Sequence, residues 1–138
     1  MRIYIAGPLF TQEDKKINES FAVRLRSNKD NQVYLPQEYK VKDAEKMPNE
    51  DWAQKVNEHD MEMLKACDTV LAIVRGGKAS DDGTAFEIGY AAALGKRIWI
   101  YADEREPISL MFLNENIRIF QSGALFDEIL GKDSLRYT

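Results

Sequence analysis

Short apolar runs alternate along this chain with segments whose apolar residues recur at helical spacing, and this alternation constrains the fold more than any other feature. When helices connect successive strands, the strands lie parallel and each crossover is right-handed. We therefore predict an α/β fold with a doubly wound, five-stranded parallel sheet in the order 2-1-3-4-5 and helices on both faces. The strands are expected at Arg2–Ala6, Gln32–Leu35, Thr69–Val74, Ile98–Tyr101 and Ile117–Phe120.

The helices are predicted from apolar spacing and from residues that favour helix ends. Thr11 and Asp14 resemble a capping box for the first helix, which should run to about Asn28. The third helix, Gly83–Leu94, ends at a glycine. The polar segment 37–50 is expected to be a long loop, with or without a frayed helical turn. The second helix, from Asn49, carries an apolar stripe of Trp52, Val56, Met63, Leu64 and Cys67, and a short last helix is expected at Ala124–Leu130, capped by Ser122.

The composition is typical of a globular protein that binds a small molecule. With 138 residues, 44% hydrophobic and 30% charged, the chain is expected to form one domain over residues 1–138. Its net charge of −4 and pI near 5.1 do not favour binding to nucleic acid. Cys67 is the only cysteine, and no apolar run approaches the roughly 20 residues of a membrane span. We expect a cytoplasmic protein with no nucleic-acid polymer or membrane as partner.

A ligand site is expected where the strand order reverses, between the first and third strands, outside the carboxyl ends of the strands. The loops Gly7–Phe10 and Arg75–Asp82 should open there, and Glu87 follows in the first turns of the next helix. The helix N-terminus favours an ionised carboxylate, whereas the nearby Asp81 opposes it. A partly desolvated carboxylate of this kind suits a glycosyl nucleophile, although an ordinary helix-start acid gives the same pattern.

Three further residues have two interpretations each. Asp60 lies on or beside the apolar stripe of the second helix, so it sits either at the edge of the stripe or in a pocket where a raised pKa lets it donate a proton. Tyr4 is either plain core or bonded through its hydroxyl to a carboxylate across the crevice. Asp81 either forms part of a turn or accepts hydrogen bonds from the hydroxyl groups of a ligand.

Several familiar chemistries are excluded by the sequence. His59-Asp60 matches the paired motif of metal-dependent phosphohydrolases, but those sites need several histidines and this chain has one. The chain contains neither the phosphate-loop motif nor the dinucleotide-binding motif. We therefore do not expect metal-dependent phosphohydrolase, nucleotide-triphosphate or dinucleotide chemistry, and we place His59 on the surface and Cys67 in the core.

Three motifs occur in order along most of the chain: IYIAGPLF at Ile3–Phe10, Asp60 followed by Ala66-Cys67-Asp68, and DDGTAFEIGYA at residues 81–91. The last is the most specific, because its Asp, Gly, Thr, Glu and Ala stand at fixed spacing between a strand and a helix. Together the motifs resemble the nucleoside 2-deoxyribosyltransferase family over about residues 3–111.

This resemblance implies a flavodoxin-like fold and an enzyme that exchanges the base of a 2′-deoxynucleoside without a metal or cofactor. Glu87 would attack the anomeric carbon, release the base and hold the sugar covalently until a second base takes it. Tyr4 would position the Glu87 carboxylate, Asp60 would handle the proton on the base, and Asp81 would bind a sugar hydroxyl. The remaining substrate contacts would come from Gly7, Pro8, Phe10, Gln37, Gly83, Ser109 and Met111.

One departure from the family pattern concerns the 5′ end of the sugar. Many transferases carry an asparagine, donated by a neighbouring subunit, where this chain has Ser109. A serine there resembles related deoxynucleotide N-hydrolases, which bind a 5′-phosphate, but those hydrolases have a small hydroxyl residue where this chain has the charged Asp81. The balance favours an unphosphorylated nucleoside. Donation of Ser109 and Met111 across an interface would require a homo-oligomer with a shared active site.

Two alternatives to transfer are compatible with the same residues. Water instead of a second base would capture the same intermediate if it enters the site, which gives an N-glycosidase acting on a 2′-deoxynucleoside or its 5′-monophosphate. A non-catalytic module that binds nucleosides or nucleotides is the other alternative, because a fold does not fix a function.

Overall fold

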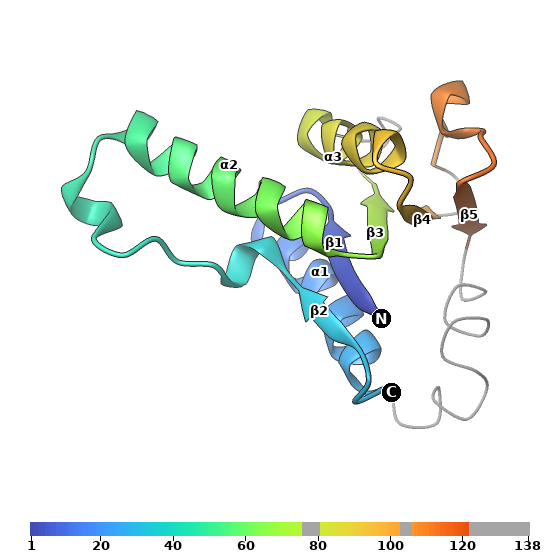
Figure 1. Cartoon of the computed structure of the whole chain (residues 1–138), viewed down its shortest axis with the longest axis horizontal. Helices are drawn as coiled ribbons and strands as arrows, with labels where there is room; N and C mark the ends of the chain where they lie inside the picture. The colour runs from blue at the N-terminus through green and yellow to red at the C-terminus, as the bar shows by residue number, and fades with distance from the viewer. Residues whose placement is uncertain (76–80, 103–105, 122–138) are drawn as a thin grey trace.

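The computed structural model describes residues 1–75, 81–102 and 106–121. Five strands form one parallel sheet in the predicted order, β2-β1-β3-β4-β5 (Figure 1). Each predicted strand is present, and no end differs from its prediction by more than one residue. The strands are β1 (Arg2–Ala6), β2 (Gln32–Tyr34), β3 (Thr69–Val74), β4 (Arg97–Ala102) and β5 (Ile117–Gln121).

Within the described residues the helices are α1 (Gln12–Arg26), α2 (Asn49–Ala66) and α3 (Asp82–Ala93). Two short 3-10 turns, η1 (Pro36–Glu38) and η2 (Ala44–Lys46), lie in the predicted loop between β2 and α2. A third turn, η3 (Leu110–Phe112), precedes β5. The helix predicted at Ala124–Leu130, with Ser122 as its cap, lies outside the described residues.

The helix ends follow from side chains that the sequence places there. The Asp14 amide donates to Thr11 Oγ1 at 3.0 Å and the Thr11 amide donates to Asp14 Oδ2 at 3.1 Å, so the predicted capping box is present. Asp81 caps α3 by accepting a hydrogen bond from the Thr84 amide. Gly95 follows α3 with a φ of 72°, a left-handed value that glycine adopts without strain.

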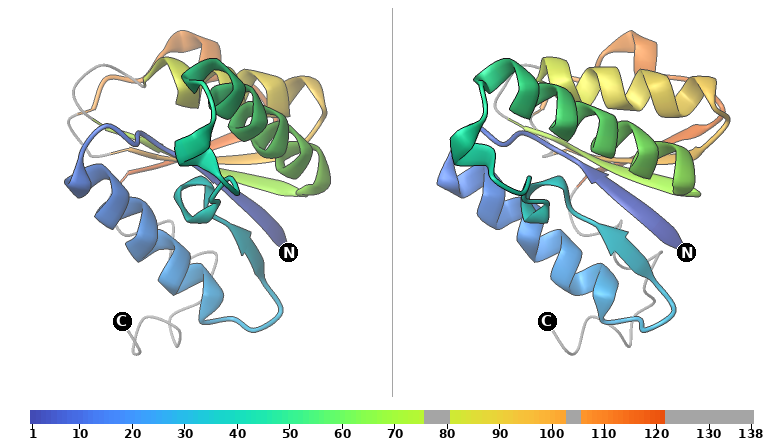
Figure 2. Two further views of the ribbon diagram at one scale, coloured as in Figure 1. Left: turned by 90° about the vertical axis from the view of Figure 1, so that its left-hand side faces the viewer. Right: turned by 60° about the vertical axis from the view of Figure 1, so that its left-hand side comes forward.

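Helices cover both faces of the sheet (Figure 2). On one face Phe21 and Leu25 of α1 pack with Leu71 of β3 and its neighbours. On the other face Leu64 of α2 and Ile88 of α3 belong to a second apolar cluster. All six residues of β3 are buried, which explains why this strand is a continuous apolar run rather than an alternating one.

The second helix is covered by the sheet along only part of its length. Leu64 and Cys67 are 0% and 5% exposed, whereas Trp52 is 45% exposed. The predicted apolar stripe is therefore wrong at its first member. In Figure 1 the N-terminal half of α2, which carries Trp52, lies beyond the edge of the sheet, so that half lacks the packing that buries Leu64.

The register of the sheet brings the carboxyl ends of β1 and β3 together at the reversal of strand order. Tyr4 of β1 is paired with Tyr34 of β2 on one side and with Val70 of β3 on the other. Because α1 and α3 pack on opposite faces, the loops after β1 and β3 diverge and leave a crevice between them.

Candidate active site

Tyr4 and Glu87 form the centre of this crevice. Tyr4 is fully buried in β1, and its hydroxyl donates a hydrogen bond to Oε2 of Glu87. Glu87 lies in the second turn of α3, on the face that also buries Thr84 and Ile88. Tyr4 is therefore a core residue, and the carboxylate expected across the crevice satisfies its hydroxyl.

Burial governs the ionisation of Glu87. Burial raises the pKa of this carboxyl most strongly, the Tyr4 hydrogen bond lowers it, and the charges of Asp60 and Asp81 raise it, with a net pKa of about 7. The expectation that the helix N-terminus holds Glu87 ionised is thus outweighed. The helix field is strongest at the unpaired amides of the first turn, and Glu87 lies beyond them in the second turn.

Asp60 points into the crevice from α2 rather than lying at the edge of the apolar stripe. Its Oδ1 accepts a hydrogen bond from the Tyr34 hydroxyl at 2.8 Å. Burial raises the pKa of the Asp60 carboxyl, and the Tyr34 hydrogen bond and nearby His59 act in the opposite direction. The pocket interpretation of Asp60 is the one that the structure supports.

His59 is not the surface residue that the sequence suggested. Its ring is partly buried and stacks on Tyr39, with ring centroids 3.7 Å apart and planes at 3°. Its Nδ1 lies 2.8 Å from the Tyr34 hydroxyl. Sequence reasoning missed both Tyr34 and His59 as site residues. The available signal was the residue pair His59-Asp60, read only as a metal motif.

Four of the predicted site residues line one cavity, although they come from three different segments of the chain. They are Gly7, Asp60, Gly83 and Glu87, and the same cavity is also lined by Leu9, Pro36, Asn57, Met61 and Phe86. Asp81 lies beside it at the N-terminus of α3, where Thr84 donates to it through both its amide and its hydroxyl. Asp81 therefore belongs to a turn, as one of its two interpretations predicted. It is the N-cap of α3 and lies next to the cavity.

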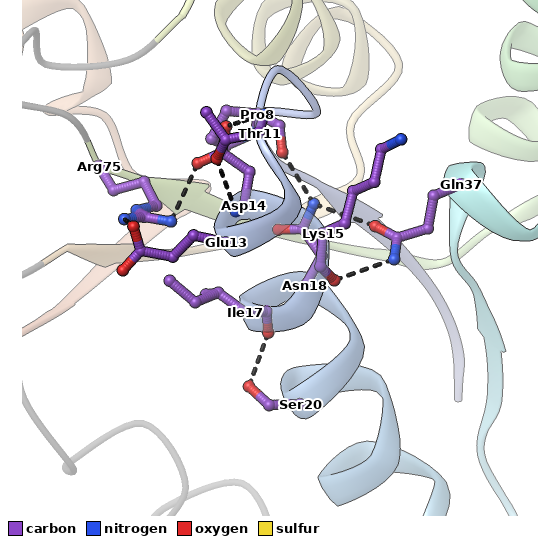
Figure 3. Close-up of polar contacts among 10 residues, drawn as sticks. All are labelled: Pro8, Thr11, Glu13, Asp14, Lys15, Ile17, Asn18, Ser20, Gln37 and Arg75. Atoms are coloured by element: carbon purple, nitrogen blue, oxygen red, sulfur yellow. Dashed lines mark hydrogen bonds and ion pairs between the residues drawn. The ribbon is translucent and has the colours of Figure 1, made fainter.

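The loop after β1 is held from two sides (Figure 3). Asn18 of α1 is 1% exposed, and its Nδ2 donates to the carbonyl of the buried Pro8 at 3.0 Å. Arg75, at the end of β3, donates to Asp14 Oδ1 at 2.9 Å. These contacts fix the start of α1 against β3 and so set the position of Gly7 in the cavity wall.

Gln37 and Phe10 lie outside the cavity wall. The Gln37 amide donates to the Lys15 carbonyl at 2.9 Å and accepts from Asn18 Nδ2 at 3.4 Å, so its side chain is bonded to α1 (Figure 3). The preceding Pro36 lines the cavity in its place. Phe10 is 81% exposed.

Ser109 and Met111 also lie away from the cavity of their own chain. Ser109 caps η3 and accepts a hydrogen bond from the Met111 amide at 3.2 Å. Leu110 and Met111 are each 82% exposed. Their expected role in the site of a neighbouring subunit stays a prediction.

A larger cavity of about 460 Å³ lies at the opposite ends of the strands, lined by the start of β4 and β5 and by Met1. Ligands of doubly wound sheets bind at the carboxyl ends. The paired carboxylates Asp60 and Glu87 are at that end, so we assign the site to the smaller cavity.

The described residues contain neither a metal centre nor a membrane span. No group of three or more His, Cys, Asp or Glu side chains among them is arranged to hold a metal ion. No helix in residues 1–75, 81–102 or 106–121 has the length and apolar character needed to cross a membrane.

Comparison with known proteins identifies the family and agrees with the fold. The family model of nucleoside 2-deoxyribosyltransferase matches residues 3–127. A 2-deoxyribosyltransferase from Bacillus psychrosaccharolyticus has a similar structure, with a TM-score of 0.79 and 27% identity over 93% of this chain and 91% of that one. A 2-deoxyribosyltransferase from Leishmania mexicana has a TM-score of 0.59 and 29% identity over 80% of this chain and 70% of that one. No curated protein sequence matches the chain.

A CMP N-glycosidase from Clostridium botulinum shares the fold, with a TM-score of 0.59 and 22% identity over 88% of each chain. The fold and the family model together define an enzyme that acts on nucleosides. Within that class, the chain belongs to the nucleoside 2-deoxyribosyltransferase family.

Proposed function

We propose that the protein transfers 2-deoxyribose from one nucleobase to another through a covalent deoxyribosyl-Glu87 intermediate. The observation that carries this proposal is the partly buried Glu87 carboxylate, which is bonded by the Tyr4 hydroxyl and faces the same cavity as Asp60. A carboxylate that is positioned and partly desolvated can attack an anomeric carbon, while a second carboxyl group serves the leaving group.

In the first displacement, Oε1 of Glu87 attacks C1′ of the deoxynucleoside, since Oε2 accepts the Tyr4 hydrogen bond. The bond between C1′ and the base nitrogen breaks, and its electron pair leaves with the base. A nitrogen of the base takes the proton of the Asp60 carboxyl, which lowers the cost of expelling an anion. The positive charge that develops on the sugar is stabilised by the Glu87 carboxylate.

In the second displacement, a nitrogen of the incoming base attacks C1′ and the bond to Glu87 breaks. The incoming base gives its proton back to Asp60, so the enzyme returns to its starting state. Two inversions at C1′ retain the configuration of the nucleoside. Water in place of the second base would give free deoxyribose, so the exclusion of water from the cavity decides between transfer and hydrolysis.

The mechanism requires an ionised Glu87 and a protonated Asp60. Burial raises the pKa of both carboxyls, and the charge of Asp60 further disfavours the ionisation of Glu87. We infer that the pair holds one proton near neutral pH, because like charges in one cavity oppose double ionisation. The Tyr4 hydrogen bond favours the negative charge on Glu87 and the Tyr34 hydrogen bond favours it on Asp60, so the reaction uses the fraction of the pair that has the proton on Asp60.

We further propose a homo-oligomer in which the segment around η3 completes the site of a neighbouring subunit. Ser109 and Met111 lie away from the cavity of their own chain, and the exposed Leu110 and Met111 side chains are apolar. Contiguous exposed apolar side chains are typical of protein interfaces.

The decisive experiment incubates the purified protein with deoxyinosine and adenine in metal-free buffer and follows nucleosides and bases by chromatography. Deoxyadenosine and hypoxanthine rising together support transfer, and hypoxanthine with free deoxyribose supports the N-glycosidase. Glu87→Gln should abolish both, a loss of roughly 10⁴-fold or more, because the nucleophile is removed. Glu62→Gln, an exposed position on α2, is the matched control. No turnover with this pair, with a thymidine donor or with deoxynucleotides would support the binding module instead.

A further inference from the structure

The Tyr34 hydroxyl lies between Asp60, which lines the cavity, and the partly buried His59, its neighbour on α2. It is 2.8 Å from Asp60 Oδ1 and 2.8 Å from His59 Nδ1. A tyrosine hydroxyl carries one proton and can accept as well as donate. The three groups therefore form a continuous hydrogen-bond chain from the cavity to a partly exposed imidazole.

The direction of this chain depends on where the Asp60 proton is. When Asp60 is ionised, Tyr34 donates to its carboxylate and must accept from a protonated Nδ1 of His59. When Asp60 is protonated, its hydroxyl donates to Tyr34, and Tyr34 donates to a bare Nδ1. The two states of Asp60 thus require different tautomers of His59.

We propose that Tyr34 and His59 form a proton relay between solvent and Asp60. This inference rests on the proposed role of Asp60 in protonating the base. After Asp60 has lost its proton, the Tyr34 proton passes to its carboxylate and the His59 Nδ1 proton passes to the Tyr34 oxygen. A solvent proton enters at Nε2 of His59. The net transfer is one proton from solvent to Asp60, and no bond between heavy atoms changes. When an incoming base later delivers its own proton to Asp60, the same path runs in reverse and returns one proton to solvent.

The surroundings of the relay suit this role. Burial raises the pKa of the Tyr34 hydroxyl above its ordinary value, so Tyr34 conducts a proton without itself becoming an anion. Its ring packs on Tyr4 at a centroid distance of 5.3 Å, and the stacked Tyr39 holds the His59 ring in place. The other titratable groups that face these three hydrogen-bonded residues are Tyr4 on β1, Glu87 on α3 and Tyr39 after η1.

The relay acts through Asp60, so Tyr34 and His59 are positioning residues for the reaction and contact no substrate. A purely structural role would fix the Asp60 side chain and leave only the direct electrostatic effect between Asp60 and His59, which Tyr34→Phe does not remove. The distinguishing property is therefore the part of the histidine's response to Asp60 that needs the Tyr34 hydroxyl.

Nuclear magnetic resonance can measure this response directly, because His59 is the only histidine and its ring nitrogens are unambiguous. In wild-type protein the chemical shift of His59 Nδ1, plotted against pH, should show an inflection where Asp60 titrates. Asp60→Asn should remove that inflection, and Tyr34→Phe should remove the part of it that needs the Tyr34 hydroxyl. Tyr101→Phe, on the opposite face of the sheet, should keep the whole inflection. A wild-type profile without the inflection, or an inflection that Tyr34→Phe leaves unchanged, overturns the relay whatever the activity.

Kinetics provide the second readout. Tyr34→Phe and His59→Gln should lower kcat for base release with little change in KM, by less than the roughly 10²–10⁴-fold contribution of the acid itself. Their pH profiles should differ from that of wild type, and Tyr101→Phe should match wild type. Unchanged profiles in both variants overturn the relay. A wild-type protein that releases no base from any donor contradicts the proposed function instead. The resonance experiment then still decides whether Tyr34 and His59 transfer a proton to Asp60.

Discussion

Tyr4 and Tyr34 are register partners on the neighbouring parallel strands β1 and β2, and their hydroxyl groups donate to two different carboxylates. Tyr4 bonds Glu87 of α3, and Tyr34 bonds Asp60 of α2. Partners in register project from the same face of a sheet. One pair of strands therefore positions both acidic groups of the site, although these groups belong to separate helices.

The first prediction concerns the Tyr4 hydrogen bond. Tyr4→Phe removes a donor that lowers the pKa of Glu87, so this pKa should rise above its wild-type value of about 7. The ionised nucleophile then forms only at higher pH, so the acid limb of the plot of kcat/KM against pH should move to higher pH. The measurement is a pH-rate profile of base release, with Tyr101→Phe as the control. An acid limb that stays in place would show that Tyr4 does not govern the charge of Glu87.

The second prediction links the charge of Glu87 to stability. Its folded pKa of about 7 exceeds the ordinary 4.5, so the folded state binds the proton more tightly than the unfolded state. The contribution of this proton to the free energy of unfolding, up to about 3 kcal/mol, is fully present below pH 4.5 and is lost as pH rises through 7. Glu87→Gln cannot lose this proton. The variant should equal wild type in free energy of unfolding near pH 4.5 and exceed it at pH 8.

Urea denaturation at the two pH values tests this prediction. Glu62→Gln, which changes an exposed carboxyl, should follow wild type at both. If Glu87→Gln loses stability in parallel with wild type between these pH values, the raised pKa of Glu87 is wrong.

The third prediction uses two glycines. A Cβ at Gly7 would lie 2.6 Å from Asn18 Oδ1, and that side chain is buried and bonded to the Pro8 carbonyl. Gly7→Ala should therefore destabilise the fold by about 1–3 kcal/mol and reduce turnover, because it displaces the cavity wall. At Gly89 a Cβ meets nothing within 4 Å. Gly89→Ala should instead stabilise α3 by roughly 0.5–1 kcal/mol, since alanine is the better helix former.

Thermal unfolding and activity assays distinguish these two variants. Asn18→Ala combined with Gly7→Ala should remove the close contact and regain part of the lost activity. Equal effects of Gly7→Ala and Gly89→Ala would mean that the contact with Asn18 does not constrain the loop.

The strand order and helix ends were predictable because they depend on local chemistry. The capping pair Thr11 and Asp14 acts over three residues, and the apolar runs are contiguous. The partners of Asp60 were not predictable in this way. Its bond with Tyr34 depends on the register of β2 and on the path of α2 across the sheet. The exposure of Trp52 has a similar cause, because helical spacing does not reveal where the sheet ends.

The last prediction concerns assembly. Leu110 and Met111 are apolar and each 82% exposed, so burial in a neighbouring subunit would stabilise an oligomer. Met111→Glu would place a charge in that interface, and both the molar mass measured by light scattering and the turnover should fall, the latter by roughly tenfold or more. Val23→Glu, at an apolar position of α1 that is 61% exposed, should change neither. If η3 completes the partner's site, mass and activity fall together. A fully active monomer would instead place every group that the reaction needs within one chain.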